Sequence, residues 1–283
     1  MTRNSNSISA GWRRSLASAW STTGWSSTAS PSTATVRRSS RLLAAARLAA
    51  LLGWLLFCVV AHLLTRPFGR SPWPRRLLRG VAWLAGARVR CAGPPVAPRT
   101  LIIANHVSWL DIPALAGATD CAFVAKDGLK AHPVMRWLCR ENGTVFVDRG
   151  DRRGIADQAA AMRAALDTRR PLTLFPEGTV GDGAALLPFR PALLSAFAPA
   201  PSGIALRPVA IDYNGAAPDF GWPQGESGTA NFLRLLGRRG TVAITLHLLA
   251  PLPPGDDRKQ LAAQAQDAIA AALAPSGLAS AAV

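Results

Sequence analysis

From residue 88 onward, short apolar runs alternate with amphipathic stretches, and this alternation limits the possible folds more than any other feature of the chain. Strand-like and helix-like stretches in alternation predict an α/β fold: a sheet, here expected to be mixed, flanked by helices. The expected strands are residues 87–92, 101–105, 121–125, 144–147, 171–175, 204–213 and 241–249, and the clearest helices are residues 113–118, 128–141, 153–168, 191–197 and 258–273. Residues 214–228 are rich in Gly, Pro and Ala, which predicts a surface loop beside the substrate.

Residues 42–64 are almost wholly apolar, which is close to the length needed to cross a bilayer core. A shorter apolar patch at 81–87 follows a stretch that contains several arginines and three prolines. The pattern favours a pair of helices that dip into one leaflet and keep their basic ends on the cytoplasmic side. A buried helix of a soluble protein is the alternative. We therefore expect a membrane-associated helical segment at 41–87 and an α/β domain at 88–283.

Residues 1–40 are rich in Ser, Thr and Ala and have no apolar period that could bury a core. A disordered basic arm is the prediction for this region. An organellar transit peptide, or a start codon assigned too far upstream, would give a similar composition.

The net charge of +16 is concentrated near the N-terminus, because no Asp or Glu precedes Asp111 and all 15 basic residues before it are arginine. Arginines separated by long Leu, Ala and Trp runs favour anionic membrane lipids as partners over nucleic acid. The inner (cytoplasmic) membrane, with the active site on its cytoplasmic side, is the location we expect. The four cysteines are widely spaced and indicate neither a zinc site nor a disulfide framework.

Asn105-His106-Val107-Ser108-Trp109-Leu110-Asp111 supplies the clearest base and carboxylate pair. On one regular helix, residues five apart lie about 140° from each other, so a bend must separate His106 from Asp111 if the two are to meet. The expected strand ends at Asn105 and a helix opens near Pro113, which provides that bend. An aspartate that accepts a proton from one imidazole nitrogen leaves the other nitrogen free as a base. In the alternative interpretation Asp111 caps the helix and His106 is an ordinary loop residue.

Three further segments end apolar strands and carry polar side chains. Arg149 follows the strand 144–147, where its guanidinium could clamp an anionic head group. Glu177 follows the strand 171–175 in a Pro-Glu-Gly turn, where its carboxylate could accept hydrogen bonds or orient a hydroxyl. In isolation each is equally well explained as a surface group. The third segment, Arg207-Pro208-Val209, says nothing about function alone, although Pro208 suits an edge, a bulge or a channel wall.

Together, in order and spacing, these segments resemble the four sequence blocks of the glycerolipid acyltransferases, with the bacterial 1-acylglycerol-3-phosphate acyltransferases as the nearest branch. The resemblance covers roughly residues 88–250. It implies that His106 is the general base that deprotonates the acceptor hydroxyl and that Asp111 stabilises the imidazolium. It further implies that Arg149 and the turn Glu177-Gly178-Thr179 hold the acceptor head group. Acyl-CoA or acyl carrier protein would donate the acyl group, and neither a metal nor an organic cofactor is implied.

One position departs from the family pattern. Phosphatidic-acid-forming members commonly continue the third block as Glu-Gly-Thr-Arg-Ser, whereas Val180-Gly181-Asp182 follows Thr179 here. A valine cannot neutralise a phosphate and Asp182 would oppose one, although Arg190 could replace the lost charge. The family's commonest acceptor, 1-acylglycerol-3-phosphate, remains the first expectation. Lyso-ornithine lipid or another lysophospholipid is the alternative.

Two other classes of function compete with acyl transfer. Ser108 beside His106 could suggest a hydrolase, but the G-x-S-x-G elbow that presents a nucleophilic serine is missing. A non-enzymatic membrane protein would need neither His106 nor Glu177.

Overall fold

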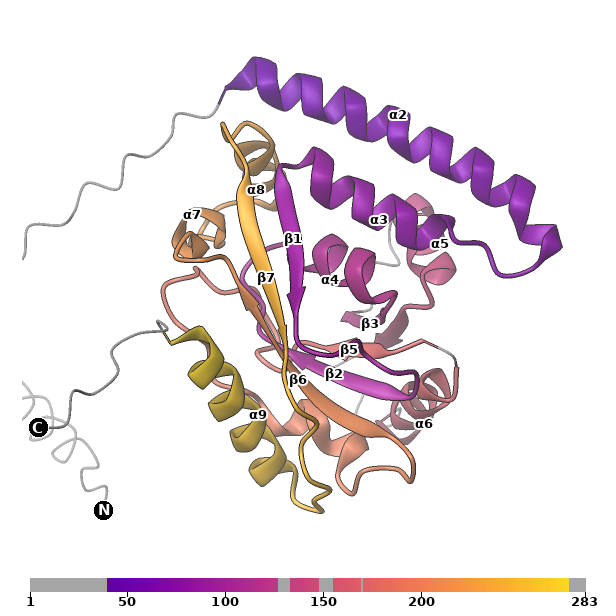
Figure 1. Cartoon of the computed structure of the whole chain (residues 1–283), viewed down its shortest axis with the longest axis vertical. Helices are drawn as coiled ribbons and strands as arrows, with labels where there is room; N and C mark the ends of the chain where they lie inside the picture. The colour runs from indigo at the N-terminus through magenta and orange to yellow at the C-terminus, as the bar shows by residue number, and fades with distance from the viewer. Residues whose placement is uncertain (1–39, 127–132, 148–154, 169, 275–283) are drawn as a thin grey trace, which may run out of the picture. The chain divides into compact units, whose positions relative to one another are not determined.

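The structure is a computed structural model that describes residues 40–126, 133–147, 155–168 and 170–274 (Figure 1). These residues belong to one compact unit, Arg37–Val283. The predicted arm at 1–40 lies outside the described residues except for Ser40, and the predicted head-group residue Arg149 also lies outside them.

A seven-stranded mixed sheet in the order β1-β7-β6-β2-β5-β3-β4 confirms the predicted fold class. All neighbouring pairs are parallel except β6 and β7, so β1 and β7 run against the other five strands. The strands lie close to the predicted ranges: β1 Ala87–Ala92, β2 Thr100–Ala104, β3 Ala122–Lys126, β4 Val145–Val147, β5 Leu172–Leu174, β6 Ala205–Asp212 and β7 Val242–Leu248.

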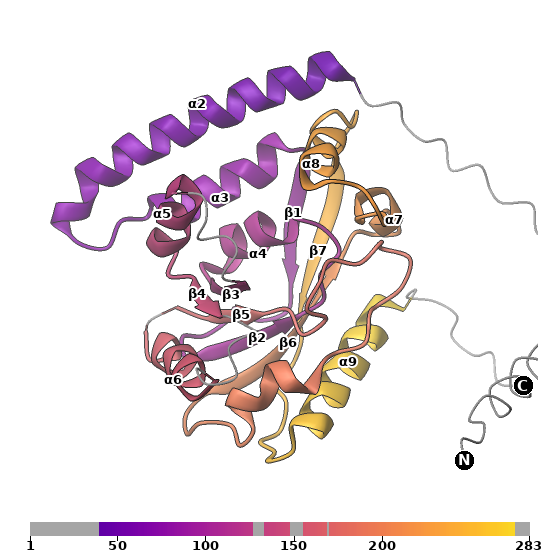
Figure 2. The same ribbon diagram turned by 180° about the vertical axis from the view of Figure 1, so that it is seen from behind.

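Helices cover both faces of the sheet, as Figures 1 and 2 show from opposite sides. The strand β2 is buried along its whole length because its side chains alternate between two hydrophobic cores. Ile102 and Ala104 pack in the core under α2 (Arg41–Thr65), α3 (Trp73–Leu84), α4 (Asp111–Thr119) and α8 (Gly228–Leu236). Leu101 and Ile103 pack in the core under α6 (Ile155–Leu166), the 3-10 helix η3 (Pro191–Phe197) and α9 (Arg258–Leu273).

The two N-terminal helices α2 and α3 form the predicted helical pair, joined by the 3-10 helix η1 (Arg66–Phe68). They lie close together because Gly80 leaves room for the ring of Trp54, whose Nε1 donates to the Leu77 carbonyl at 3.2 Å. Of the described helices, α2 is the one that is long and apolar enough to cross a membrane. Many large apolar side chains of this helical pair point into solvent: Leu42, Leu52, Leu56, Phe57, Val60, Leu63, Leu64, Phe68 and Trp83.

Polar side chains fasten α2 to the α/β domain near both of its ends. Near the N-terminal end, Arg47 donates to the carbonyl oxygens of Leu236, Arg238 and Gly240 at 3.0, 2.8 and 3.2 Å. Near the C-terminal end, His62 is buried and lies 3.1 Å from a carboxylate oxygen of Glu141 in α5 (Pro133–Glu141). The helix therefore runs along the domain instead of leaving it.

Two segments differ from the sequence-based expectation. Residues 191–197 form a 3-10 helix. The segment predicted as a loop at 214–228 contains the short helix α7 (Ala217–Phe220) and the N-cap of α8, where the Ser227 hydroxyl accepts from the Ala230 N–H at 3.2 Å. The sequence analysis missed α8 itself.

Candidate active site

The predicted base, His106, lies directly beyond the end of β2, where the side chain of Asn105 takes over the pairing with β6. The Asn105 Nδ2 donates to the Ile211 carbonyl at 3.1 Å, and the Ile211 N–H donates back to the Asn105 Oδ1 at 2.7 Å. The Asn105 side-chain amide makes the two hydrogen bonds that another backbone residue of β2 would make, so the main chain can turn away from the sheet here. His106 thereby leaves the sheet at a fixed point, as the predicted bend requires.

Asp111, the first residue of α4, is fully buried and binds the histidine. Its Oδ2 lies 2.9 Å from the His106 Nδ1 and also accepts the backbone N–H groups of Val107 and Ser108 at 2.7 and 2.9 Å. A carboxylate held by two backbone donors requires the histidine to donate from Nδ1, which leaves Nε2 without a proton and able to accept one. The pair predicted from the sequence is thus brought together in the geometry of a general base and its orienting group.

Tyr213, which the sequence analysis did not single out, completes this pair. Its buried hydroxyl donates to the Asp111 Oδ1 at 2.6 Å. Burial, followed by the negative charge of Asp111, raises the pKa of Tyr213 well above its ordinary value, so the phenol stays protonated and acts as a donor. Tyr213 is the only tyrosine in the chain and directly follows β6.

Glu177 is 3% exposed and binds the main chain of the loop between β2 and α4: its Oε1 accepts the His106 N–H at 2.7 Å. Burial raises the pKa of this carboxyl to about 7, the charge of Asp111 adds to the rise, and the backbone N–H groups of His106 and Leu187 oppose it. The third sequence block, through Glu177, therefore contacts the first block, through His106. Glu177 was predicted to hold the acceptor head group, and in the structure its carboxylate binds the loop that carries His106.

The imidazole of His106 stacks on the ring of Phe175, with centroids 4.1 Å apart and planes 14° apart. The loop is also held on its other side, since the Gly181 N–H donates to the His106 carbonyl at 3.0 Å. Together with the bond to Asp111, these contacts fix the position of the ring before any substrate arrives.

A cavity of ≈ 470 Å³ opens beside this group. It is lined by His106 and Glu177, by Asp212 and Tyr213 at the end of β6, and otherwise mainly by small or apolar residues. The part of the chain that the structure describes contributes no Arg or Lys side chain to its lining. The remaining lining residues are Asn105, Val107, Gly181, Gly183, Ala184, Ala185, Leu186, Ile211, Gly215, Ala217, Pro218, Ala270, Leu273 and Ala274.

Three predicted head-group residues do not line this cavity. Gly178 has a φ of +76° and forms the turn after Glu177. The side chains of Thr179 and Arg190 are exposed. The segment predicted as the loop at 214–228 does reach the cavity, through Gly215 and α7.

Arg207, in the fourth sequence block, is buried and holds backbone instead of facing the cavity. Its guanidinium donates to four carbonyl oxygens, those of Pro94, Pro95, Leu248 and Leu249, at 2.7 to 3.0 Å. Pro208 has no N–H to offer β7, and the bond from the Arg207 Nε occupies the Leu249 carbonyl at this point. The strand β6 lies between β7 and β2, so Pro208 is not on an edge strand, one of the positions that the sequence suggested for it.

The described part of the chain brings no three His, Cys, Asp or Glu side chains together as a candidate metal site. The expected independence from metals and cofactors stays a prediction.

The chain is similar in sequence to known acyltransferases. The family model described as Acyltransferase matches residues 88–212. A lyso-ornithine lipid O-acyltransferase of Pseudomonas aeruginosa is 39% identical over 216 residues, which cover 72% of this chain and 80% of that protein. The 1-acyl-sn-glycerol-3-phosphate acyltransferase of Neisseria gonorrhoeae is 40% identical over 93 residues, covering 33% of this chain and 36% of that protein.

Among solved structures, the crystal structure of the 1-acyl-sn-glycerophosphate acyltransferase PlsC from Thermotoga maritima has a TM-score of 0.54 to this chain. The two are 20% identical, and the match covers 83% of this chain and all of that one. This likeness confirms the fold.

Proposed function

Because this chain belongs to the acyltransferase family, we propose that it transfers a fatty acyl group to the free hydroxyl of a lysolipid, and that lyso-ornithine lipid is that acceptor. The acyl donor would be the thioester of acyl-CoA or of acyl carrier protein. A non-enzymatic membrane protein, the remote alternative, has no use for the His106 and Asp111 geometry.

In the proposed reaction, the His106 Nε2 removes the proton from the lysolipid hydroxyl as its oxygen attacks the thioester carbonyl carbon. The buried carboxylate of Asp111 stabilises the imidazolium that forms. Collapse of the tetrahedral intermediate breaks the carbon–sulfur bond, and the departing thiolate takes the proton back from His106. The products are an ester and a free thiol, and the histidine is regenerated.

The observation that carries the acceptor is the charge around the cavity. Asp212 lines it with a partly exposed carboxylate whose Oδ2 lies 3.5 Å from the His247 Nε2, and no Arg or Lys side chain of the described residues lines it. Ornithine carries a side-chain amine that is protonated at neutral pH, so it suits such a cavity better than a phosphate dianion does. Val180 stands where phosphatidic-acid-forming members of the family commonly have an arginine that would face the phosphate, and this difference agrees with the preference.

The decisive experiment incubates purified full-length protein with radiolabelled acyl-CoA and a panel of lysolipids. We expect transfer to lyso-ornithine lipid that His106→Ala abolishes. Asp212→Asn should raise the KM for lyso-ornithine lipid, whereas Asp182→Asn, an exposed carboxylate outside the cavity lining, should not. Thioester cleavage that needs no lysolipid, or full activity in His106→Ala, would contradict the mechanism.

1-acylglycerol-3-phosphate is the second candidate acceptor, and the relative of Neisseria gonorrhoeae supports it. The same panel separates the two. Faster transfer to 1-acylglycerol-3-phosphate than to lyso-ornithine lipid would reverse our preference without affecting the assignment of acyl transfer.

We also propose that α2 lies in the plane of the cytoplasmic leaflet of the inner membrane, with its exposed apolar side chains among the lipids. Its attachments near both ends, through Arg47 and His62, support this arrangement, because a spanning helix would leave the domain. Single cysteines placed at Arg41 and at Arg66, exposed polar positions at the two ends of α2, in a chain lacking its native cysteines, should both react with an impermeant maleimide from the cytoplasmic side. Reaction from opposite sides would indicate a spanning helix.

A further inference from the structure

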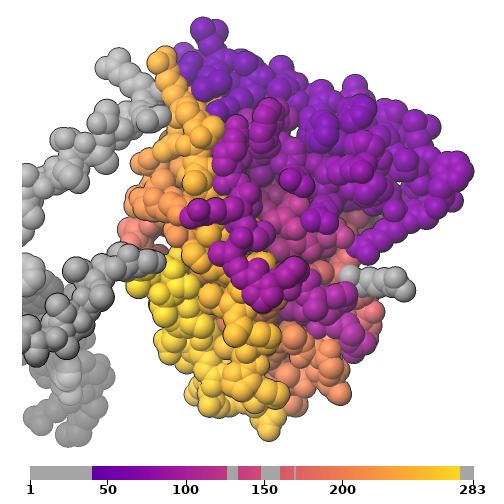
Figure 3. Space-filling view, viewed as in Figure 1, coloured from indigo at the N-terminus to yellow at the C-terminus, as the bar shows by residue number. Residues whose placement is uncertain are grey.

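A second hollow, of ≈ 380 Å³, lies between α3, β1 and α4 and shares no lining residue with the cavity beside His106. We call it the arginine pocket, because Arg75, Arg79 and Arg88 line it. Trp83 also lines it and is 60% exposed. None of the described residues in its lining is acidic. Figure 1 shows α3, β1 and α4 next to one another, and Figure 3 shows the surface of the molecule from the same side.

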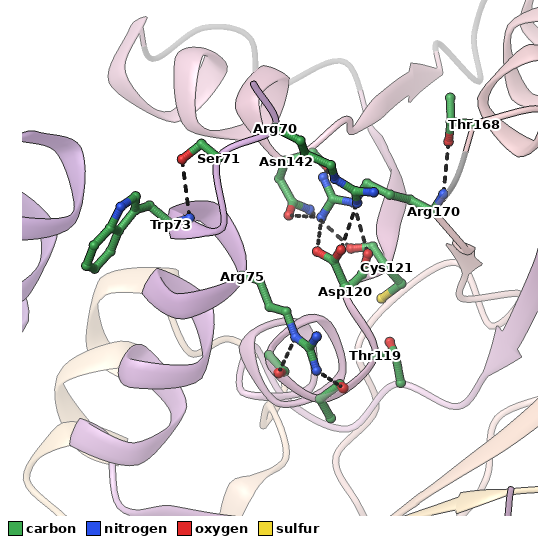
Figure 4. A network of polar contacts seen from close by, with 12 residues as sticks. Arg70, Ser71, Trp73, Arg75, Thr119, Asp120, Cys121, Asn142, Thr168 and Arg170 are labelled. Atoms are coloured by element: carbon green, nitrogen blue, oxygen red, sulfur yellow. Dashed lines mark hydrogen bonds and ion pairs between the residues drawn. The ribbon is translucent and has the colours of Figure 1, made fainter. Parts of the chain in front are cut away.

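Two of the three guanidinium groups are held in place by backbone carbonyls. Arg75 donates to the carbonyls of Gly117 and Ala118 at 3.2 and 2.7 Å, as the close view in Figure 4 shows. Arg88 donates to the Trp83 carbonyl at 3.1 Å and lies 5.1 Å from the centroid of the Trp83 ring. Carbonyl oxygens orient a guanidinium and use only some of its five N–H donors, and they carry no net charge to neutralise it.

The carboxylate of Asp120, drawn in Figure 4, already binds two other arginines. Asp120 accepts from Arg70 at 2.7 Å and from Arg170 at 3.1 Å, and it does not line the arginine pocket. The Arg79 side chain has no hydrogen bond or ion pair with any residue in the described ranges, although the Arg79 backbone packs closely against Gly117. The positive charge of the pocket therefore remains without a carboxylate partner among these residues.

Several oriented guanidinium groups without an acidic neighbour are suited to a phosphate group, which accepts bidentate hydrogen bonds from arginine. The size of the hollow fits a polar head group and not a whole lipid. Trp83 at its rim has the amphipathic ring that commonly lies at a membrane surface, and it belongs to the same helical pair whose apolar side chains are exposed. These features favour a phosphate presented by a bilayer.

We propose that the arginine pocket binds the phosphate of an anionic membrane phospholipid, separately from the acyl acceptor. The small residues Ala82, Ala114 and Gly117 line the pocket beside the three arginines, which supply the donors. A lipid bound there touches α4, the helix that begins with Asp111. This proposal does not depend on which lysolipid the enzyme acylates.

The test is flotation of full-length protein with vesicles of phosphatidylcholine alone and of phosphatidylcholine with phosphatidylglycerol. The pocket variant is Arg79→Gln with Arg88→Gln. The control, Arg41→Gln with Arg76→Gln, removes two exposed charges from the same helical pair outside the pocket. We expect the preference for phosphatidylglycerol to fall about tenfold or more in the pocket variant and markedly less in the control.

Other results would overturn the proposal. Equal losses in the two variants would mean diffuse attraction by surface charge. An unchanged lipid preference with a raised KM for acyl-CoA would assign the pocket to the phosphates of the donor. To check that outcome, the KM of the wild type is compared for acyl-CoA and for acyl-3′-dephospho-CoA. Equal values would show that the 3′-phosphate is not bound. Arg79→Gln alone, at a residue without a partner among those described, provides a variant that should fold normally if the double variant does not.

Discussion

The Tyr213 hydroxyl and the Asp111 carboxylate are joined by a 2.6 Å hydrogen bond, although the two residues lie 102 positions apart in the chain. The bond uses Oδ1, the oxygen that His106 does not contact. Since Oδ2 already accepts from the histidine and from two backbone N–H groups, both oxygens of this fully buried carboxylate have donors. The orientation of the His106 and Asp111 pair therefore depends on β6 as well as on its own loop.

Tyr213→Phe should lower both stability and turnover, because it leaves one oxygen of a buried carboxylate without a donor. We expect a loss of about 2 kcal/mol in the free energy of unfolding and about a tenfold fall in kcat, with KM nearly unchanged. Urea denaturation and steady-state kinetics measure the two effects. Phe220→Leu, which disturbs the ring that packs against Tyr213, is the control and should affect stability without a comparable loss of kcat. Unchanged kinetics in Tyr213→Phe would show that Asp111 needs no second anchor.

Glu177→Gln should alter the dependence of stability on pH. The folded-state pKa of about 7 lies above the ordinary value of 4.5, so the native protein binds more protons than the unfolded chain between these pH values. The stability of the wild type therefore falls as pH rises from about 4.5 to about 7 and changes no further from this group above that range. Relative to Glu177→Gln, which cannot titrate, the wild type should lose up to about 3 kcal/mol. Urea denaturation at pH 5 and pH 8 measures this, and parallel curves for the two proteins would contradict it.

Arg207→Met should destabilise the protein without altering the chemistry of the folded fraction. The methionine keeps an apolar stem but leaves four carbonyl oxygens, one buried and three partly buried, without the donors that Arg207 supplies. We expect a loss of about 3 kcal/mol or more in the free energy of unfolding. Activity per folded molecule should persist, since Arg207 does not line the cavity. A stable but inactive variant would instead indicate a direct part in catalysis.

Gly221→Ala should distort the cavity although Gly221 does not line it. A Cβ there would overlap the Asp182 carbonyl oxygen, so the backbone of residues 181–183 must move. That segment binds the carbonyl of His106 through the Gly181 N–H. We expect about a tenfold lower kcat/KM and a loss of about 1–3 kcal/mol in stability. Gly255→Ala, with nothing within 4 Å of its Cβ, is the matched control and should change stability by less than about 0.5 kcal/mol.

Local sequence pattern predicted the seven strands and offered the pairing of His106 with Asp111 as one of two interpretations, beside a helix cap and an ordinary loop histidine. Both depend on residues close together in the chain: a buried strand, a bend and a helix start. The resemblance to a family then supplied a chemical role for the pair. It also brought Glu177 to the site, but its residue type did not reveal that the carboxylate would accept a backbone N–H.

The parts that could not be predicted depend on which strands become neighbours. Tyr213 and Ile211 contact the loop between β2 and α4 because β6 pairs with β2. The order of strands in a sheet cannot be predicted from local periodicity. The helix α8 was missed because it begins at Gly228, directly after a segment rich in Gly and Pro, and its apolar face is recognisable only once it packs on the sheet. Tertiary contacts here outweigh local propensity.

The attachment of α2 near both ends has a consequence for how a substrate reaches the enzyme. If the exposed side of this helix rests among lipids, then the depth at which it settles also determines how high His106 stands above the hydrocarbon. In this proposed arrangement, the attachments of α2 would keep His106 at one height above the bilayer. A lysolipid would then have to move out of the leaflet by the height of His106 above the hydrocarbon to present its hydroxyl. The rest of its acyl chain would stay in the leaflet.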